Sequence, residues 1–366
     1  MKDQLKVIIS GGGTGGHIFP AISIAKALQE KVPECEILFI GAKNRMEMQK
    51  IPQAGYEIIG LPVEGLVRKI SIKNLRVAIN LLISLSRAQS IINSFKPDVV
   101  VGVGGFASGP VLRIANKKNV PTLIQEQNSY PGITNKLLAK KAQKICVAYE
   151  GMEKYFPADK IVLTGNPVRK DILVDISHQE AFDHFRMKPT FKTLLVIGGS
   201  LGARTINQSI AAGIDKFIEN GIQVIWQTGK YYIDEATKIE KETNSEYLHV
   251  KEFIHRMDYA FNVADLVISR AGAGTISELC LTGKPVILVP SPNVAEDHQT
   301  KNAMALVKNE AAVLITDSES QSALCDTASR IIDNENKLYK LEENITKMAI
   351  KNSDEIIVDE ILKLVN

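Results

Sequence analysis

The chain has 366 residues, of which 45% are hydrophobic and 23% charged, and its formal net charge is +3. This length and composition fit about two globular domains and exclude disordered, collagen-like and disulfide-scaffold proteins. Four scattered cysteines without a C-x-x-C pair argue against a zinc ribbon or redox motif and indicate a reducing compartment.

Short apolar runs alternate with amphipathic stretches from the N-terminus onward. The amphipathic stretches 18–31 and 72–95 have the pattern of helices. Such alternation predicts a parallel sheet covered by helices on both faces. The strands predicted in the first half are residues 7–10, 37–41, 99–103, 122–125 and 144–148.

The same pattern restarts after an interruption by Thr-Gly-Asn-Pro within residues 163–171. We therefore predict a domain of residues 1–165 and a second of residues 166–345, with a strandless helical tail from residue 336. The strands predicted in the second half are residues 194–197, 224–227, 248–250, 266–269 and 286–289.

Charge is distributed unevenly between the two halves. Residues 1–165 contain 22 Lys and Arg against 12 Asp and Glu, whereas residues 166–366 contain 22 against 29. The excess is concentrated in residues 65–144, with 13 against 2. It favours an anionic partner for the first half, such as a membrane, a nucleic acid or a phosphorylated substrate, over patterning for solubility alone.

Three glycine-rich loops, residues 11–17, 102–109 and 198–204, follow predicted strands and open helices. Glycine lets the backbone approach a ligand closely, and the N–H groups at a helix N-terminus favour anions. The loops indicate phosphate binding, and tight strand-to-helix turns are the alternative. A dinucleotide site is disfavoured because the second strand ends in Gly41-Ala42 instead of an acidic residue. His17 in place of Lys excludes a P-loop.

Polar residues also follow strands of the second half. Thr275 and Glu278 have the spacing of a helix-capping box, although Glu278 could instead accept both hydroxyls of a ribose. The cluster 296–299 is a sugar-binding loop or a solvated loop. The sequence contains neither a His-Glu-x-x-His nor an Asp-x-Asp motif, and we predict no metal site and no cofactor. The charge of a diphosphate would then need cations, for which Arg169 is a candidate, and a surface arginine is the alternative.

Several of these motifs occur in a fixed order along residues 5–310 and together resemble the murein N-acetylglucosaminyltransferases, glycosyltransferase family 28. The resemblance implies a glycosyltransferase-B fold, with two Rossmann-like domains whose parallel sheets face each other across a cleft. A C-terminal helix of about residues 346–366 would pack back on the first domain. The motifs are residues 12–20, 104–110, 126–128 with 134–136, 165–169, 198–203 and 297–299.

The family's activity is then expected of this chain. It is the inverting transfer of N-acetylglucosamine from UDP-N-acetylglucosamine to the 4-hydroxyl of the muramyl sugar of lipid I. The product, lipid II, serves peptidoglycan synthesis. The resemblance implies no nucleic acid partner, and it is compatible with contacts to proteins of cell-wall synthesis and division.

The resemblance also implies site residues. In the second half, Ser200 would contact the diphosphate, Ile254 the uracil and Gln299 the sugar hydroxyls. The nucleotide would lie along Ala273, Gly274, Thr275, Ile276, Ser277 and Glu278, with the ribose on the last of them. In the first half, the donor sugar would contact Thr14, Gly15, Gly16 and Asn128, and Arg169 would complete the nucleotide side.

A base must take the proton of the attacking hydroxyl. His17 is the first candidate because it follows a glycine loop and an unperturbed imidazole titrates near pH 6.5. Its alternative role is to bond backbone and orient that loop. Glu126 is the second candidate. Gln125 stands where relatives often carry His, which weakens a catalytic role at that position.

A polyprenyl substrate requires contact with a membrane. No acidic residue occurs from 65 to 90, where Leu66, Val67, Arg68, Lys69 and Lys73 combine apolar and basic character. This predicts a patch on anionic lipid, with a core helix at 72–85 as the alternative. The N-terminal apolar run is too short for a signal peptide, and no run of 18 apolar residues predicts a spanning helix. We expect a peripheral protein on the cytoplasmic face of the plasma membrane.

Three other functions fit parts of the pattern. A UDP-N-acetylglucosamine epimerase would yield an epimerised sugar nucleotide and need no lipid. A membrane-bound nucleotide-sugar sensor would bind the donor without releasing UDP. A nicotinamide dehydrogenase is the weakest alternative, since the ribose-binding acid is missing.

Overall fold

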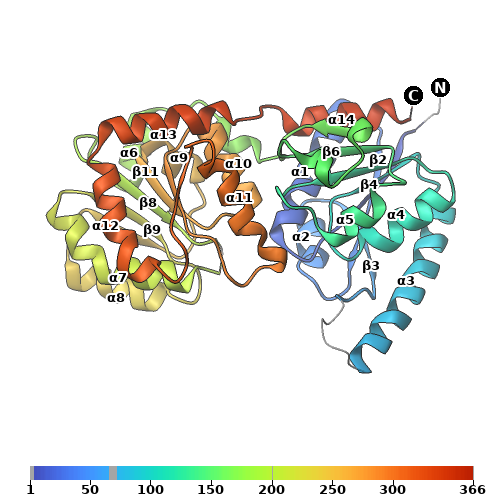
Figure 1. Cartoon of the computed structure of the whole chain (residues 1–366), viewed down its shortest axis with the longest axis horizontal. Helices are drawn as coiled ribbons and strands as arrows, with labels where there is room; N and C mark the ends of the chain where they lie inside the picture. Colours follow the sequence, from blue (N-terminus) through green and yellow to red (C-terminus); the bar gives the residue numbers. More distant parts are fainter. Residues whose placement is uncertain (1–3, 66–71, 200, 366) are drawn as a thin grey trace. The chain divides into compact units, whose positions relative to one another are not determined.

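The computed structural model describes residues 4–65, 72–199 and 201–365 (Figure 1). The chain divides into two compact units. Unit 1 comprises Met1–Arg169 and Ile350–Asn366, and unit 2 comprises Lys170–Ala349. Each unit contains one parallel sheet, as the alternating pattern predicts.

Unit 1 is built on a seven-stranded parallel sheet in the order β3-β2-β1-β4-β5-β6-β7. The five strands predicted in the first half are confirmed, whereas β3 and β7 were not predicted. The strands are β1 (Lys6–Ser10), β2 (Glu36–Ala42), β3 (Glu57–Leu61), β4 (Val99–Gly102), β5 (Thr122–Glu126), β6 (Lys144–Val147) and β7 (Ile161–Leu163).

Helices cover both faces of this sheet because strand side chains alternate between faces. Ile8 packs in a cluster with α3, α4 and α5, while its neighbours Val7 and Ile9 pack in a cluster with α1, α2 and α14. The helices are α1 (Gly15–Lys31), α2 (Glu47–Gln53), α3 (Ile72–Phe95), α4 (Ser108–Lys117), α5 (Ile133–Leu138) and α14 (Ser353–Lys363).

Unit 2 is built on a six-stranded parallel sheet in the order β10-β9-β8-β11-β12-β13. Its five predicted strands are confirmed, and the two-residue β13 was not predicted. The strands are β8 (Thr193–Ile197), β9 (Gln223–Gln227), β10 (Leu248–Lys251), β11 (Leu266–Ser269), β12 (Val286–Leu288) and β13 (Val313–Leu314).

The core of unit 2 surrounds Trp226, which is fully buried and packs in a cluster with residues of α7, α12 and α13. The indole N–H donates to Asn207 Oδ1 at 3.0 Å, so the one polar atom of this side chain is satisfied. The helices are α6 (His178–Phe185), α7 (Arg204–Glu219), α8 (Ile233–Thr243), α9 (Met257–Val263), α10 (Ala273–Thr282), α11 (His298–Val307), α12 (Ser320–Ile332) and α13 (Glu335–Lys347).

The C-terminal tail is helical, as predicted, and consists of α13 in unit 2 and α14 in unit 1. Three apolar residues of α14, Ile357, Val358 and Ile361, are fully buried in the cluster that contains α1. The last helix therefore belongs to the core of unit 1, although the chain reaches it from unit 2.

Helix α3 is not the core helix that we considered as an alternative. Val77, Ser84, Ala88 and Ile92 are buried on one side, but Leu75 is 66% and Leu82 67% exposed. By length and composition alone, its segment Leu75–Phe95 could cross a membrane, since its mean hydropathy is 1.3. The search for 18 consecutive apolar residues did not detect this segment. Its buried side packs on unit 1, as in a surface helix.

Candidate active site

The expected site residues follow the carboxyl ends of strands in both units. In unit 1 they follow β1, β5 and β7, and in unit 2 they follow β8, β10, β11 and β12. Open parallel sheets bind ligands at this edge, where the strand order reverses. The reversal lies between β1 and β4 in unit 1 and between β8 and β11 in unit 2. Ser200 lies outside the described residues.

His17 lies in the first turn of α1 and is half-buried. Its Nδ1 is 3.1 Å from the carbonyl oxygen of Gly12 and 3.3 Å from Thr14 Oγ1. A ring that donates from Nδ1 to this carbonyl presents Nε2 as its proton acceptor. A Cβ at Gly104 would lie 2.8 Å from Nε2, so the glycine makes room for the ring.

Thr14, Gly15 and Gly16 stand beside His17 at the start of α1. Thr14 is the N-cap residue with extended backbone, and Gly15 is the first residue of the helix. The first turn carries no acidic residue.

Glu126 ends β5, and its carboxylate is buried within the loop that follows. It accepts hydrogen bonds from Asn128 N at 3.0 Å, Gly132 N at 3.1 Å and Asn135 Nδ2 at 2.8 Å. Burial raises the pKa of Glu126, and these hydrogen bonds act in the opposite direction. Both oxygens of Glu126 are therefore engaged, and the carboxylate positions Asn128.

Buried amides connect this loop to the segment before Arg169. Gln125 Nε2 donates to Asn166 Oδ1 at 3.0 Å, and Asn166 Nδ2 donates to the carbonyl of Gln127 at 3.0 Å. Gln127 in turn donates to the carbonyl of Val103 at 2.8 Å. In this chain Gln125 therefore has a structural role, because it connects the loop after β5 to Asn166. Arg169, at the end of the same segment, is exposed.

In unit 2, Gln227 connects two predicted parts of the site. Its Nε2 donates to the carbonyl of Gly199 in the third glycine loop at 3.3 Å, and its Oε1 accepts from Ile254 N at 2.9 Å. Sequence reasoning missed this residue. The available signal was a polar side chain at the carboxyl end of a strand whose three central residues are apolar.

The expected nucleotide residues Ala273, Gly274, Thr275, Ile276, Ser277 and Glu278 form the first turns of α10. The capping-box interpretation of Thr275 is wrong, because the helix begins at Ala273 with Gly272 as its N-cap. Thr275 therefore lies inside the first turn. Glu278 is half-buried on the same helix.

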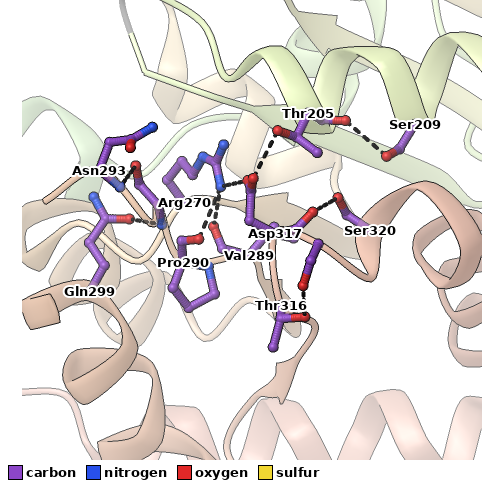
Figure 2. A network of polar contacts seen from close by, with 12 residues as sticks. Thr205, Ser209, Arg270, Val289, Pro290, Asn293, Gln299, Thr316, Asp317 and Ser320 are labelled. Atoms are coloured by element: carbon purple, nitrogen blue, oxygen red, sulfur yellow. Dashed lines mark hydrogen bonds and ion pairs between the residues drawn. The ribbon is translucent and has the colours of Figure 1, made fainter.

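A polar network joins the loops that follow β11, β12 and β13 (Figure 2). Arg270 Nη1 donates to the carbonyls of Val289 and Pro290, each at 3.1 Å, and pairs with Asp317 Oδ1 at 2.5 Å. Thr205 Oγ1 donates to the other oxygen of Asp317 at 3.0 Å. Sequence reasoning missed the network because Asp317 lies 47 residues beyond Arg270.

Gln299 lies next to this network on α11 (Figure 2). Its Oε1 accepts the backbone N–H of Ser291 at 2.8 Å. One end of the amide thus fixes the loop after β12. In the part of the chain that the structure describes, no group of three or more His, Cys, Asp or Glu is placed to hold a metal ion.

Two Rossmann-like units with polar loops at the carboxyl ends of parallel sheets define the glycosyltransferase-B class. Within this class, sequence similarity identifies the family. The chain belongs to glycosyltransferase family 28, since residues 7–147 match its N-terminal domain and residues 193–358 its C-terminal domain.

Relatives match the chain along its whole length. A protein of Parabacteroides distasonis is 58% identical, with 99% of each chain covered. One of Bacteroides thetaiotaomicron is 56% identical, with 100% of this chain and 99% of the relative covered. Both are named UDP-N-acetylglucosamine--N-acetylmuramyl-(pentapeptide) pyrophosphoryl-undecaprenol N-acetylglucosamine transferase.

Solved structures have the same fold. MurG of Acinetobacter baumannii superposes with a TM-score of 0.80 at 26% identity, covering 98% of this chain and 99% of that one. The UDP-GlcNAc 2-epimerase of Neisseria meningitidis superposes with a TM-score of 0.68 at 16% identity, covering 98% and 100%. The second likeness shows the fold alone.

Proposed function

We propose that this chain is an inverting glycosyltransferase that moves N-acetylglucosamine from UDP-N-acetylglucosamine to the 4-hydroxyl of the muramyl sugar of lipid I. The product is lipid II, the precursor for peptidoglycan. The observation that carries this proposal is the 58% identity, over 99% of both chains, to a relative named for this transfer.

The reaction is a displacement at the anomeric carbon of the donor. The muramyl 4-oxygen forms a bond to this carbon, the bond to UDP breaks, and UDP leaves with the electron pair. His17 Nε2 takes the hydroxyl proton. The contact between Nδ1 and Gly12 supports this role, because it orients the ring and fixes which nitrogen accepts.

We assign acceptor binding to unit 1 and donor binding to unit 2. In unit 2, the start of α10 would bind the nucleotide, with Glu278 at the ribose, Ile254 at the uracil and Ser200 at the diphosphate. Gln299 would bind the sugar hydroxyls. In unit 1, Thr14, Gly15, Gly16 and Asn128 would contact the donor sugar, and Arg169 would contact the nucleotide. No metal is needed when helix N-termini and cations meet the diphosphate charge.

We also propose that unit 1 docks on the cytoplasmic face of the plasma membrane. Leu75, Ile79, Leu81, Leu82 and Ile83 are 41–67% exposed on α3. Basic side chains also lie beside α3. Arg113, Lys117 and Lys141 line, together with residues of α3, a pocket of about 760 Å³. Apolar side chains near cations suit an anionic bilayer. Of the residues expected in this patch, Leu66, Val67, Arg68 and Lys69 lie outside the described residues.

The first test is UDP release from UDP-N-acetylglucosamine in the presence of a chelator, with and without a lipid I analogue. We expect release that depends on the acceptor. Tight UDP binding without release, in folded protein and with a verified analogue, would instead support a sensor. An epimerised sugar nucleotide would support an epimerase.

His17→Ala tests the base. General-base catalysis contributes about 10²- to 10⁴-fold, so turnover should fall by that order while the affinity for UDP changes little. Steady-state kinetics together with calorimetric UDP binding separate the two quantities. Equal turnover in the variant and the wild type would exclude His17.

Leu75→Glu with Leu82→Glu tests the membrane surface. Both side chains are mostly exposed, so stability should change by less than about 1 kcal/mol. Co-sedimentation with vesicles containing phosphatidylglycerol should decrease strongly. Tyr339→Glu, at a site 70% exposed in unit 2, is the matched control. Unchanged co-sedimentation of the α3 variant would place the docking surface elsewhere.

A further inference from the structure

Glu47 is a buried acidic residue that the proposed reaction does not use. It is the first residue of α2 and is 1% exposed. Its Oε2 accepts the N–H of Gly13 at 2.9 Å, and its Oε1 accepts the N–H of Ala42 at 3.0 Å. The carboxylate thus joins the first glycine loop to the end of β2.

Two glycines make room for this side chain. A Cβ at Gly12 would lie 2.2 Å from Glu47 Oε1, and one at Gly41 would lie 2.6 Å from its Cγ. Gly12 and Gly13 also have φ values of +143° and +90°, which side-chain-bearing residues rarely adopt. The glycines of this loop therefore accommodate an anion that the chain itself supplies.

This arrangement changes the role of the first glycine loop. Glycine-loop N–H groups bind phosphate in many Rossmann-like folds. Here the N–H of Gly13 is already bonded to a carboxylate, and a phosphate placed there would meet a like charge. The phosphate-binding interpretation of residues 11–17 therefore does not hold at Gly13.

The loop does have a second contact, and it leads to the reacting groups. The carbonyl of Gly12 is 3.1 Å from His17 Nδ1. Glu47 holds the residues on either side of this carbonyl, through contact with Gly12 and a hydrogen bond from Gly13. A shift of the loop would thus turn the imidazole.

We propose that Glu47 is a positioning residue for glycosyl transfer: its carboxylate fills the first glycine loop as an internal anion, and the loop orients His17 instead of binding a substrate phosphate. This inference rests on the proposed function, with His17 as the base.

Glu47→Gln tests the proposal. The amide nitrogen would face a backbone N–H, so one hydrogen bond is replaced by two opposed donors. We expect kcat to fall by about tenfold or more, with KM for UDP-N-acetylglucosamine within about threefold of wild type. Glu57→Gln, at an exposed position at the start of β3, is the matched control and should leave both unchanged.

A double-mutant cycle separates positioning from general damage. If Glu47 acts through His17, Glu47→Gln should cost little further turnover in His17→Ala protein. Equal fold-losses in both backgrounds would overturn the proposal. Should Glu47→Gln fail to fold, Glu47→Asp keeps the charge but withdraws it by one methylene, and the same cycle applies.

A readout without activity comes from the ¹⁵N spectrum of labelled histidine, with His17 assigned through His17→Ala. Glu47→Gln should change the tautomer signature of His17, and Glu57→Gln should not. An unchanged signature would overturn the proposal. If wild-type protein releases no UDP with acceptor, the proposed function fails, whereas the spectrum still tests the coupling between Glu47 and His17.

Discussion

At the scale of single residues, the site of unit 1 depends on carboxylates that are taken out of water and bonded to loop backbone. Glu126 and Glu47 do this in the same way, each with two or more N–H donors on its oxygens. A buried carboxylate without such donors would be strongly destabilising. Glu126 and Glu47 therefore hold their loops in place, and their carboxylate oxygens are less available for proton transfer.

Glu126→Gln should change how stability depends on pH. Burial raises the pKa of Glu126, so the native protein holds this proton at pH values where the unfolded chain has lost it. The resulting stabilisation is full below the ordinary glutamate pKa of about 4.3 and is lost as pH rises through the raised value. Glutamine has no such dependence.

Urea unfolding of both proteins between about pH 4 and pH 8 checks this. The stability advantage of the wild type over Glu126→Gln should be largest at the acidic end and should shrink as pH rises. A difference that is independent of pH, or that grows with pH, would contradict the raised pKa.

Single residues also show where sequence reasoning stops. His17, Glu126 and Asn128 could be identified because they lie in the ordered motifs through which the chain resembles its family. Glu47 could not, because its contact with Gly13 depends on how α2 packs against the loop, and 34 residues separate the two. The capping-box alternative at Thr275 is wrong because the spacing alone does not show where the helix begins, and α10 begins at Ala273 after Gly272.

At the scale of elements, the loops after β11, β12 and β13 are held together by one arginine. Arg270 bonds two carbonyls after β12 and an aspartate after β13, and Asp317 also accepts from Thr205 on α7. The ion pair is mostly buried, with side chains 16% and 21% exposed. This network should define where the start of α10 stands relative to Gln299.

Arg270→Lys should therefore weaken UDP binding while the charge is kept. All three acceptors surround one guanidinium nitrogen, Nη1, and the shorter lysine side chain cannot bring its ammonium to that position. We expect roughly a tenfold loss of affinity, measured by calorimetry, from about 1.4 kcal/mol of lost positioning. Arg330→Lys, whose contacts stay within α12, is the control. Equal affinity in both variants would show that the network has no part in the donor site.

Element prediction succeeded where the hydrophobic period was clear. Strands buried on both faces, such as β1 and β8, appear as continuous apolar runs and were found. Strand β3 was missed because it contains Glu57 and Gly60, and β13 because two residues carry no period. The exposed side of α3 could not be distinguished from a core helix by composition, since burial depends on what packs against it.

At the scale of the whole molecule, each unit has its own sheet and its own apolar clusters. Proteins built this way commonly unfold in more than one step, since each core can be lost separately. A ligand that binds one native unit raises the stability of that unit by mass action. Under the proposed assignment of donor binding to unit 2, UDP should shift the unfolding of that unit.

Ile357→Ala tests whether α14 is an integral part of unit 1. The side chain is fully buried in the cluster with α1, so the substitution should cost unit 1 about 2–5 kcal/mol. Ile206→Ala, equally buried on α7, should cost unit 2 a similar amount. Scanning calorimetry with and without UDP assigns the transitions. Ile357→Ala should lower the temperature of the transition that UDP does not shift, because the side chains of α14 are buried in the core of unit 1. Ile206→Ala should lower the temperature of the transition that UDP raises. If Ile357→Ala lowered only the transition that UDP raises, α14 would belong energetically to the donor-binding unit.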